Sequence, residues 1–264
     1  MEKLNYRRTF FIGLAFLSIC AFWQMYDNVI PLILQNTFHL NETFTGAIMA
    51  ADNILAVFLL PFFGTLSDKA NTRLGKRTPF IITGTCVAVL FLMLLPFADK
   101  NQNFIMFVAC LAVLLVAMGF YRSPAVALMP DLTPKPLRSK ANAVINLMGA
   151  IGGVYTLLLI RFLVKGGARP DYTAVFAGVA FLMAAAVILL VLTVKEKKIA
   201  AEIEKEEIQE EKLAGEAIAE NTKELLKPVK KSLYMILLSI FFWFAAYNAV
   251  TTAFSRYAVK DAHE

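Results

Sequence analysis

Seven long apolar stretches constrain the fold of this chain more than any other feature of its sequence. Each holds roughly 20 or more mostly apolar residues, enough to cross ~30 Å of hydrocarbon as a helix that rises ~1.5 Å per residue. Because lipid offers no partner for backbone N–H and C=O groups, and the stretches are too long for barrel strands, each predicts a transmembrane α-helix. They lie at about 9–35, 44–66, 78–97, 104–129, 141–164, 172–194 and 232–255.

The composition agrees with a membrane protein and excludes several function classes. Hydrophobic residues make up 58% of the 264 residues, and the mean hydropathy is +0.62, which leaves too little polar surface for a soluble domain of this size. The three cysteines all fall within predicted spans and show no metal spacing, so we expect packing roles for them. No nucleophile–base pair, metal cluster or phosphate loop is evident, so we predict neither an enzyme nor a bound cofactor or metal.

The distribution of positive charge predicts the orientation in the membrane. Nineteen of the 26 lysine and arginine residues precede the first span or fall between spans 2 and 3, 4 and 5, or 6 and 7. By the positive-inside rule these segments are cytoplasmic, in a multi-pass protein of the cell membrane. The net charge of +6 then reflects topology and contact with anionic lipid headgroups rather than nucleic-acid binding.

Three segments follow from these patterns. We predict a six-helix transmembrane bundle over 1–194, a charged cytoplasmic linker over 195–231, and the first helix of a second bundle over 232–264. Aligning Tyr26 with Tyr247 places Asp27 opposite Asn248, which suggests a parallel repeat whose other five spans are absent. The chain would then be a fragment, a truncated product, or half of a homodimer.

Two stretches resemble known transporters. Gly64, Leu66 and Asp68, followed by Arg73-Leu74-Gly75-Lys76-Arg77 and Pro79, resemble the loop 2–3 signature of the major facilitator superfamily, with a short insertion before the basic part. The segment 122–153, from Arg122-Ser-Pro to Gly152-Gly153, is similar to the sucrose/proton symporter branch, near the glycoside-pentoside-hexuronide:cation symporters. The resemblance implies an all-α major facilitator fold and proton-coupled sugar symport by alternating access. The partners would then be a small sugar and protons.

The basic loop also predicts a cytoplasmic gate. Asp68 can pair with Arg73, Lys76, Arg77 or a partner helix, and such a pair would hold one arrangement and break in another. The alternative is charge that merely fixes the topology. The candidate gate residues are Gly64, Asp68, Arg73, Gly75, Lys76, Arg77, Asp131 and Arg138.

Two carboxylates inside the apolar runs predict the coupling site. An ionisable group at a helix centre costs ~2.5–3.5 kcal/mol on insertion scales, so it usually faces a cavity or a partner. We predict that Asp27, and secondarily Asp52, exchange protons or another cation; the alternative is a structural hydrogen bond to a neighbouring helix. Asp52 lies nine residues before the span 2 proline, whereas the sodium-coupled glycoside symporters place paired carboxylates close to it, and this difference favours protons.

Polar and aromatic side chains in several spans predict the substrate contacts. Arg122 is expected to bind a substrate hydroxyl or carboxylate, the alternative being a side chain that snorkels to headgroups. Two other functions stay open: transport of another solute, such as an organic acid held by Arg122, and a non-transporting scaffold or regulatory subunit. The candidate substrate residues are Gln24, Tyr26, Asn28, Arg122, Asn142, Asn146 and Asn248.

Overall fold

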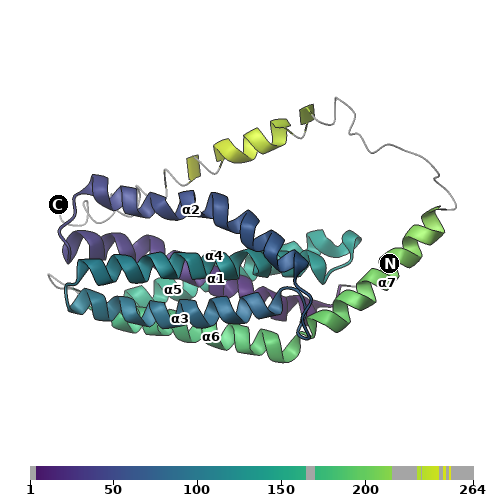
Figure 1. The fold of residues 1–264 in the computed structure, drawn as a ribbon, viewed down its shortest axis with the longest axis horizontal. Helices are drawn as coiled ribbons and strands as arrows, with labels where there is room; N and C mark the ends of the chain where they lie inside the picture. The colour runs from purple at the N-terminus through teal and green to yellow at the C-terminus, as the bar shows by residue number, and fades with distance from the viewer. Residues whose placement is uncertain are drawn as a thin grey trace. The chain divides into compact units, whose positions relative to one another are not determined.

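The computed structural model describes residues 4–164, 170–215, 231–232, 234–243, 246–247 and 250. Within these residues every regular element is helical (Figure 1). The chain divides into two compact units, residues 1–207 and 208–264, and the division falls inside the predicted linker. The helices are α1 (Tyr6–Asn36), α2 (Glu42–Lys69), α3 (Thr78–Lys100), α4 (Phe104–Asp131), η1 (Lys135–Leu137), α5 (Arg138–Leu163), α6 (Thr173–Thr193) and α7 (Glu196–Gly215).

Six of these helices are long and apolar enough to cross a membrane, which confirms the all-α prediction and the first six spans. Several begin at an asparagine whose side chain accepts a backbone hydrogen bond and so satisfies an otherwise unpaired N–H group. Asn5 accepts from Arg8 N at 3.0 Å, and Asn41 accepts from Phe44 N at 2.9 Å. The predicted seventh span covers an apolar helix at Tyr234–Trp243, and its remaining positions lie partly outside the described residues.

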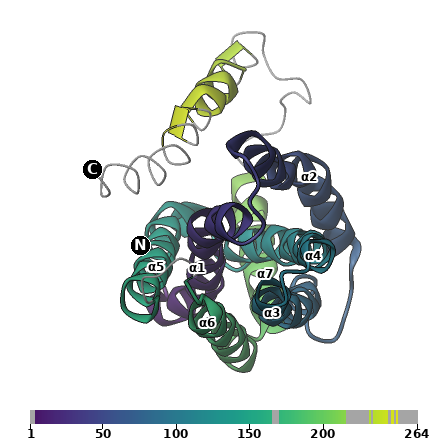
Figure 2. The same ribbon diagram turned by 90° about the vertical axis from the view of Figure 1, so that its left-hand side faces the viewer.

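The first unit is a bundle in which α1 makes the most extensive contacts with other helices. Helix α1 packs against α5 and α6, α3 packs against α4 and α6, and α2 lies at the edge against α4 (Figure 2). The tightest approach joins α1 to α5: a Cβ atom on Gly152 would lie 2.0 Å from the Leu17 carbonyl oxygen. Glycine at this position therefore lets the two backbones meet.

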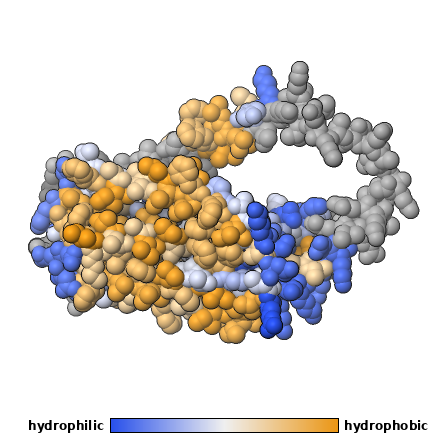
Figure 3. All heavy atoms as spheres, in the orientation of Figure 1, coloured by the Kyte–Doolittle hydropathy of each residue, from blue (hydrophilic) through white to orange (hydrophobic). Residues whose placement is uncertain are grey.

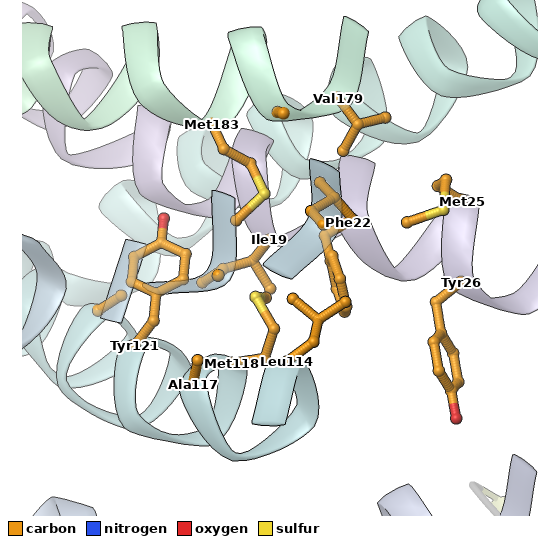
Figure 4. Close-up of a cluster of buried hydrophobic side chains, with 14 of the residues drawn as sticks. Ile19, Phe22, Met25, Tyr26, Leu114, Ala117, Met118, Tyr121, Val179 and Met183 are labelled. Carbon is orange, nitrogen blue, oxygen red and sulfur yellow. The ribbon is translucent and has the colours of Figure 1, made fainter. Parts of the chain in front are cut away.

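Apolar side chains fill the bundle and also cover its sides. On the face drawn in Figure 3, apolar groups cover the middle of the α1–α6 bundle and hydrophilic groups gather towards its two ends. This is the pattern of a protein whose outer surface faces hydrocarbon. Inside, side chains from α1, α4 and α6 converge in one cluster (Figure 4). Its members include Ile19, Phe22, Met25, Leu114, Met118, Tyr121, Val179 and Met183.

Candidate functional site

A pocket opens between α1, α2 and α4 within the membrane-spanning part of the bundle. Its polar lining comes from Asp52 on α2 and Arg122 on α4, and Trp23 on α1 supplies an aromatic face. Leucine and alanine side chains and the backbone at Gly119 complete the walls. A mostly apolar concave surface with a few convergent polar groups is the usual form of a small-molecule site.

Arg122 makes contacts that explain how a guanidinium is held at this depth. Its central carbon lies 5.5 Å from the centroid of the Trp23 ring, within the range of a cation–π interaction. The half-buried Asp52 carboxylate is close enough to attract it electrostatically. Arg122 therefore has two partners in the pocket, Trp23 and Asp52.

The two predicted coupling carboxylates lie near each other on neighbouring helices. Asp27 is exposed on α1, Asp52 is half-buried on α2, and the two charges are close enough to interact. Asn53 donates a hydrogen bond to Asp52 Oδ1 at 3.0 Å. Two titratable groups and one permanent cation are thus gathered on the α1–α2–α4 side of the bundle.

The remaining predicted residues of α1 have different surroundings. A Cβ on Gly153 would lie 3.6 Å from Gln24 Oε1, so Gln24 faces α5. Asn28 Nδ2 donates to the Gln24 carbonyl at 2.7 Å, within its own helix. Tyr26 is 1% exposed, and its hydroxyl has no hydrogen-bond partner among the described residues. Its ring packs beside Phe22 in the core.

The two predicted substrate residues of α5 lie apart from the pocket lining. Asn142 and Asn146 are exposed on α5 and do not line the pocket. Asn248 falls outside the described residues. Trp23, in contrast, has an indole N–H that is buried without a partner in the part of the chain the structure describes, beside the charged groups of the pocket.

A second polar site forms at the end of the bundle where α2 ends and α3 begins, and we call it the Arg77 network. The Arg77 side chain is 7% exposed and pairs with Asp68, while its Nε donates to Asp131 Oδ2 at 2.8 Å. Its Nη1 also donates to Ser67 Oγ and, at 3.4 Å, to the Gly64 carbonyl. One guanidinium therefore joins the ends of α2, α3 and α4.

Glu196, the first residue of α7, binds the same loop from the other side. Its carboxylate accepts from the backbone N–H groups of Lys76 at 2.6 Å, Arg77 at 2.9 Å and Thr78 at 2.8 Å. The Thr78 hydroxyl adds a fourth bond at 2.7 Å. Gly75 has a φ of +122° and lies against this carboxylate. The carboxylate thus caps the N-terminus of α3, where backbone N–H groups lack partners inside the helix.

The eight predicted gate residues divide between these two centres and the surface. Four of them, Gly64, Asp68, Arg77 and Asp131, meet in the Arg77 network. Gly75 and Lys76 contact Glu196 through the backbone instead. Arg73 is exposed, and Arg138 Nε donates to the Thr133 carbonyl at 3.2 Å. Glu196 itself was not predicted, because it is one of many glutamates in the charged segment after α6.

The bundle, its intramembrane pocket and the charged network at one end are together typical of a membrane transporter of small solutes. The family model described as Major Facilitator Superfamily matches residues 12–263, and the chain belongs to that superfamily. It is therefore a multi-pass membrane protein of a transporter family rather than of an enzyme family.

Similarity to individual proteins is more distant. Over 151 residues the chain is 24% identical to the sucrose transport protein SUC3 of Arabidopsis thaliana. That match covers 50% of this chain and 25% of the length of SUC3. No solved structure matches the chain.

Proposed function

We propose that α1–α6 form the N-terminal half of a proton-coupled sugar symporter. The observation that carries the proposal is the gathering of Asp52, Arg122 and Trp23 in one intramembrane pocket with Asp27 nearby. The distant similarity to a sucrose transport protein supports the choice of sugar. The whole site would lie near the membrane midplane between this unit and a second one, and rocking of the two units would give alternating access.

In this proposal each group of the pocket has a role. The indole of Trp23 offers a flat apolar face and an N–H group that has no partner among the described residues, and both suit a sugar ring with its hydroxyls. Arg122 donates to substrate oxygens, and its pairing with Asp52 depends on whether that carboxylate carries a proton. Asp27 and Asp52 bind and release the coupled proton. The other candidate substrate residues would contact the substrate only if a second unit held it against the surfaces on which they lie. These residues are Gln24, Asn28, Asn142 and Asn146.

The Arg77 network would serve as a gate at the cytoplasmic end. The excess of lysine and arginine at this end supports that orientation. Arg77 pairs with carboxylates from α2 and α4, so separating those helix ends would break the pairs. Replacing Asp68 with asparagine should increase the labelling of this end by a water-soluble thiol reagent, read at a cysteine introduced beside the loop. Unchanged labelling and unchanged transport would both argue against a gate.

The choice of solute can be tested by competition. Proteoliposomes containing this chain, or the chain extended by five further spans, would be given an inward proton gradient and labelled sucrose. We expect accumulation that a protonophore abolishes and that Arg122→Gln reduces strongly. Arg161→Gln is the matched control, because Arg161 lies exposed in the last turn of α5 and should leave uptake unchanged.

A second candidate function rests on Arg122 alone. A permanent cation in the pocket also suits an anionic solute, such as an organic acid. Labelled carboxylates taken up in place of sucrose would favour this function. Uptake of neither class by either form of the protein would favour a non-transporting scaffold.

A further inference from the structure

We propose that Glu196 is a positioning residue that clamps the start of α7 to the α2–α3 loop (residues 70–77) and thereby holds Arg77 in place for Asp68 and Asp131. The proposal concerns the clamp itself. The effect of the clamp on transport rests on the proposed gate, whereas the experiment below tests the clamp independently of any gate.

The first support is the completeness of the Glu196 site. Glu196 is 4% exposed, and three backbone N–H groups and one hydroxyl donate to the two oxygens of its carboxylate. A buried carboxylate is stable only when its oxygens are satisfied, and here the loop and the first turn of α3 supply all four of these donors. The remaining charged residues of α7 that the structure describes are different: Glu202, for example, forms a loose pair with Lys198 at 3.9 Å.

The second support is the shape of the loop around the carboxylate. Gly75 has a φ of +122°, a region that residues with a Cβ rarely adopt. A Cβ built there would lie 2.3 Å from Glu196 Cδ. The backbone conformation and the space at this position are therefore both fitted to the Glu196 side chain.

The third support is that one residue belongs to both sites. The backbone N–H of Arg77 donates to Glu196, while its side chain pairs with Asp68 and Asp131. Because the carboxylate fixes the backbone of residues 76–78, it also fixes the point from which the Arg77 side chain extends towards its partners. Movement of α7 away from the loop would loosen this anchor.

Apolar contacts hold α7 in the same place. Ile203 is 6% exposed, and Ile199 and Ala200 pack against the bundle core. These residues lie on the face of α7 that also carries Glu196, at helix spacings of three, four and seven. The first two turns of the charged segment are thus attached to the bundle, and a displacement of the segment would be transmitted to Arg77.

The test is a double-mutant cycle on thermal unfolding of the purified full chain in lipid nanodiscs. Glu196→Gln and Asp131→Asn remove groups that contact different parts of Arg77. If the clamp positions Arg77, the loss in unfolding temperature caused by Asp131→Asn should shrink by about half or more in the Glu196→Gln background, because sites that share a network are not additive. Glu196→Gln combined with Asp171→Asn, at the opposite end of the bundle, should be additive. Additive losses for Glu196 and Asp131 would overturn the proposal, since a simple helix cap would give that result.

Two further measurements keep the test decisive. Hydrogen exchange of the amides of residues 76–78 should become about tenfold faster or more in Glu196→Gln, as expected when a hydrogen bond to a charged group is lost, and should not change in the matched control Glu202→Gln. If Glu196→Gln does not fold, Gly75→Ala attacks the same contact from the loop side. It should produce the same faster exchange and the same loss of coupling to Asp131, and normal exchange in Gly75→Ala would contradict the clamp.

Discussion

Adding one methyl group at Gly152 should separate α1 from α5, whereas the same change at the next residue should not. A Cβ at Gly152 would lie 2.0 Å from the Leu17 carbonyl oxygen and 2.9 Å from its carbon. Since the obstacle is backbone, a side-chain rotation cannot relieve it, and the helices must move apart by roughly 1.5 Å to restore a normal contact. At Gly153 the nearest atom is Gln24 Oε1 at 3.6 Å, which is an ordinary contact.

Of the two substitutions, only Gly152→Ala is expected to lower the free energy of unfolding. Overpacking typically costs ~1–3 kcal/mol, and a backbone obstacle belongs at the upper end of that range. Replacing glycine by alanine inside a helix returns about 1 kcal/mol of helix propensity. Gly152→Ala should therefore lower the free energy of unfolding by about 2 kcal/mol. Gly153→Ala should leave it unchanged or raise it by up to about 1 kcal/mol.

The assay is reversible denaturation in mixed micelles, followed by tryptophan fluorescence, on the wild-type chain and both variants side by side. The α1–α5 contact fixes the position of α1, which carries Trp23 and Asp27, so the result also tests the geometry of the intramembrane pocket. A Gly152→Ala protein as stable as Gly153→Ala would refute the close approach of these two helices.

Two smaller predictions concern single hydrogen-bonding groups. Tyr121→Phe removes a buried hydroxyl that donates to the Ala15 carbonyl at 3.0 Å, and it should cost about 1–2 kcal/mol of unfolding free energy in the same assay; no loss would contradict a bonded hydroxyl. Near the C-terminus of α3, the Thr173 hydroxyl and backbone N–H donate hydrogen bonds to Asp171, and Lys100 pairs with it. These contacts, with those from Thr173 the larger cause, lower the pKa of Asp171 from 3.8 to about 2. Because the folded-state pKa is depressed, the small stabilisation by this exposed carboxylate should be present above about pH 4 and vanish as the pH falls towards about 2. The difference in unfolding temperature between wild type and Asp171→Asn should follow that course, and a difference that persists at the lowest pH would contradict the assignment.

The spans could be predicted from the sequence because their signal is local. Twenty apolar residues in a row require a helix in lipid whatever their neighbours do, and α1 through α6 each contain one predicted run. Pro31 and Pro61 lie inside their helices without ending them. Long membrane helices tolerate such residues because neighbouring groups satisfy the freed carbonyls.

The partners within the site could not be predicted, because they depend on how helices pack. The sequence alone does not indicate which side chain lies beside Arg122, and packing of α2 against α4 brings Asp52 to it. The loop sequence offered Asp68 three basic partners, and only the fold selects Arg77. Glu196 lies 118 residues beyond Thr78, and nothing in its local sequence separates it from the other glutamates of that segment.

The central claim is that the intramembrane carboxylates couple solute movement to protons, and sugar-induced proton uptake tests it most directly. Vesicles containing this chain, or the chain extended by five further spans, would receive sucrose while the external pH is recorded, for wild type, Asp27→Asn and Asp52→Asn. We predict alkalinisation of the medium on sugar addition, loss of that signal in Asp27→Asn, and a reduced signal in Asp52→Asn. Sugar uptake with no proton movement, or proton movement that survives both substitutions, would contradict the account.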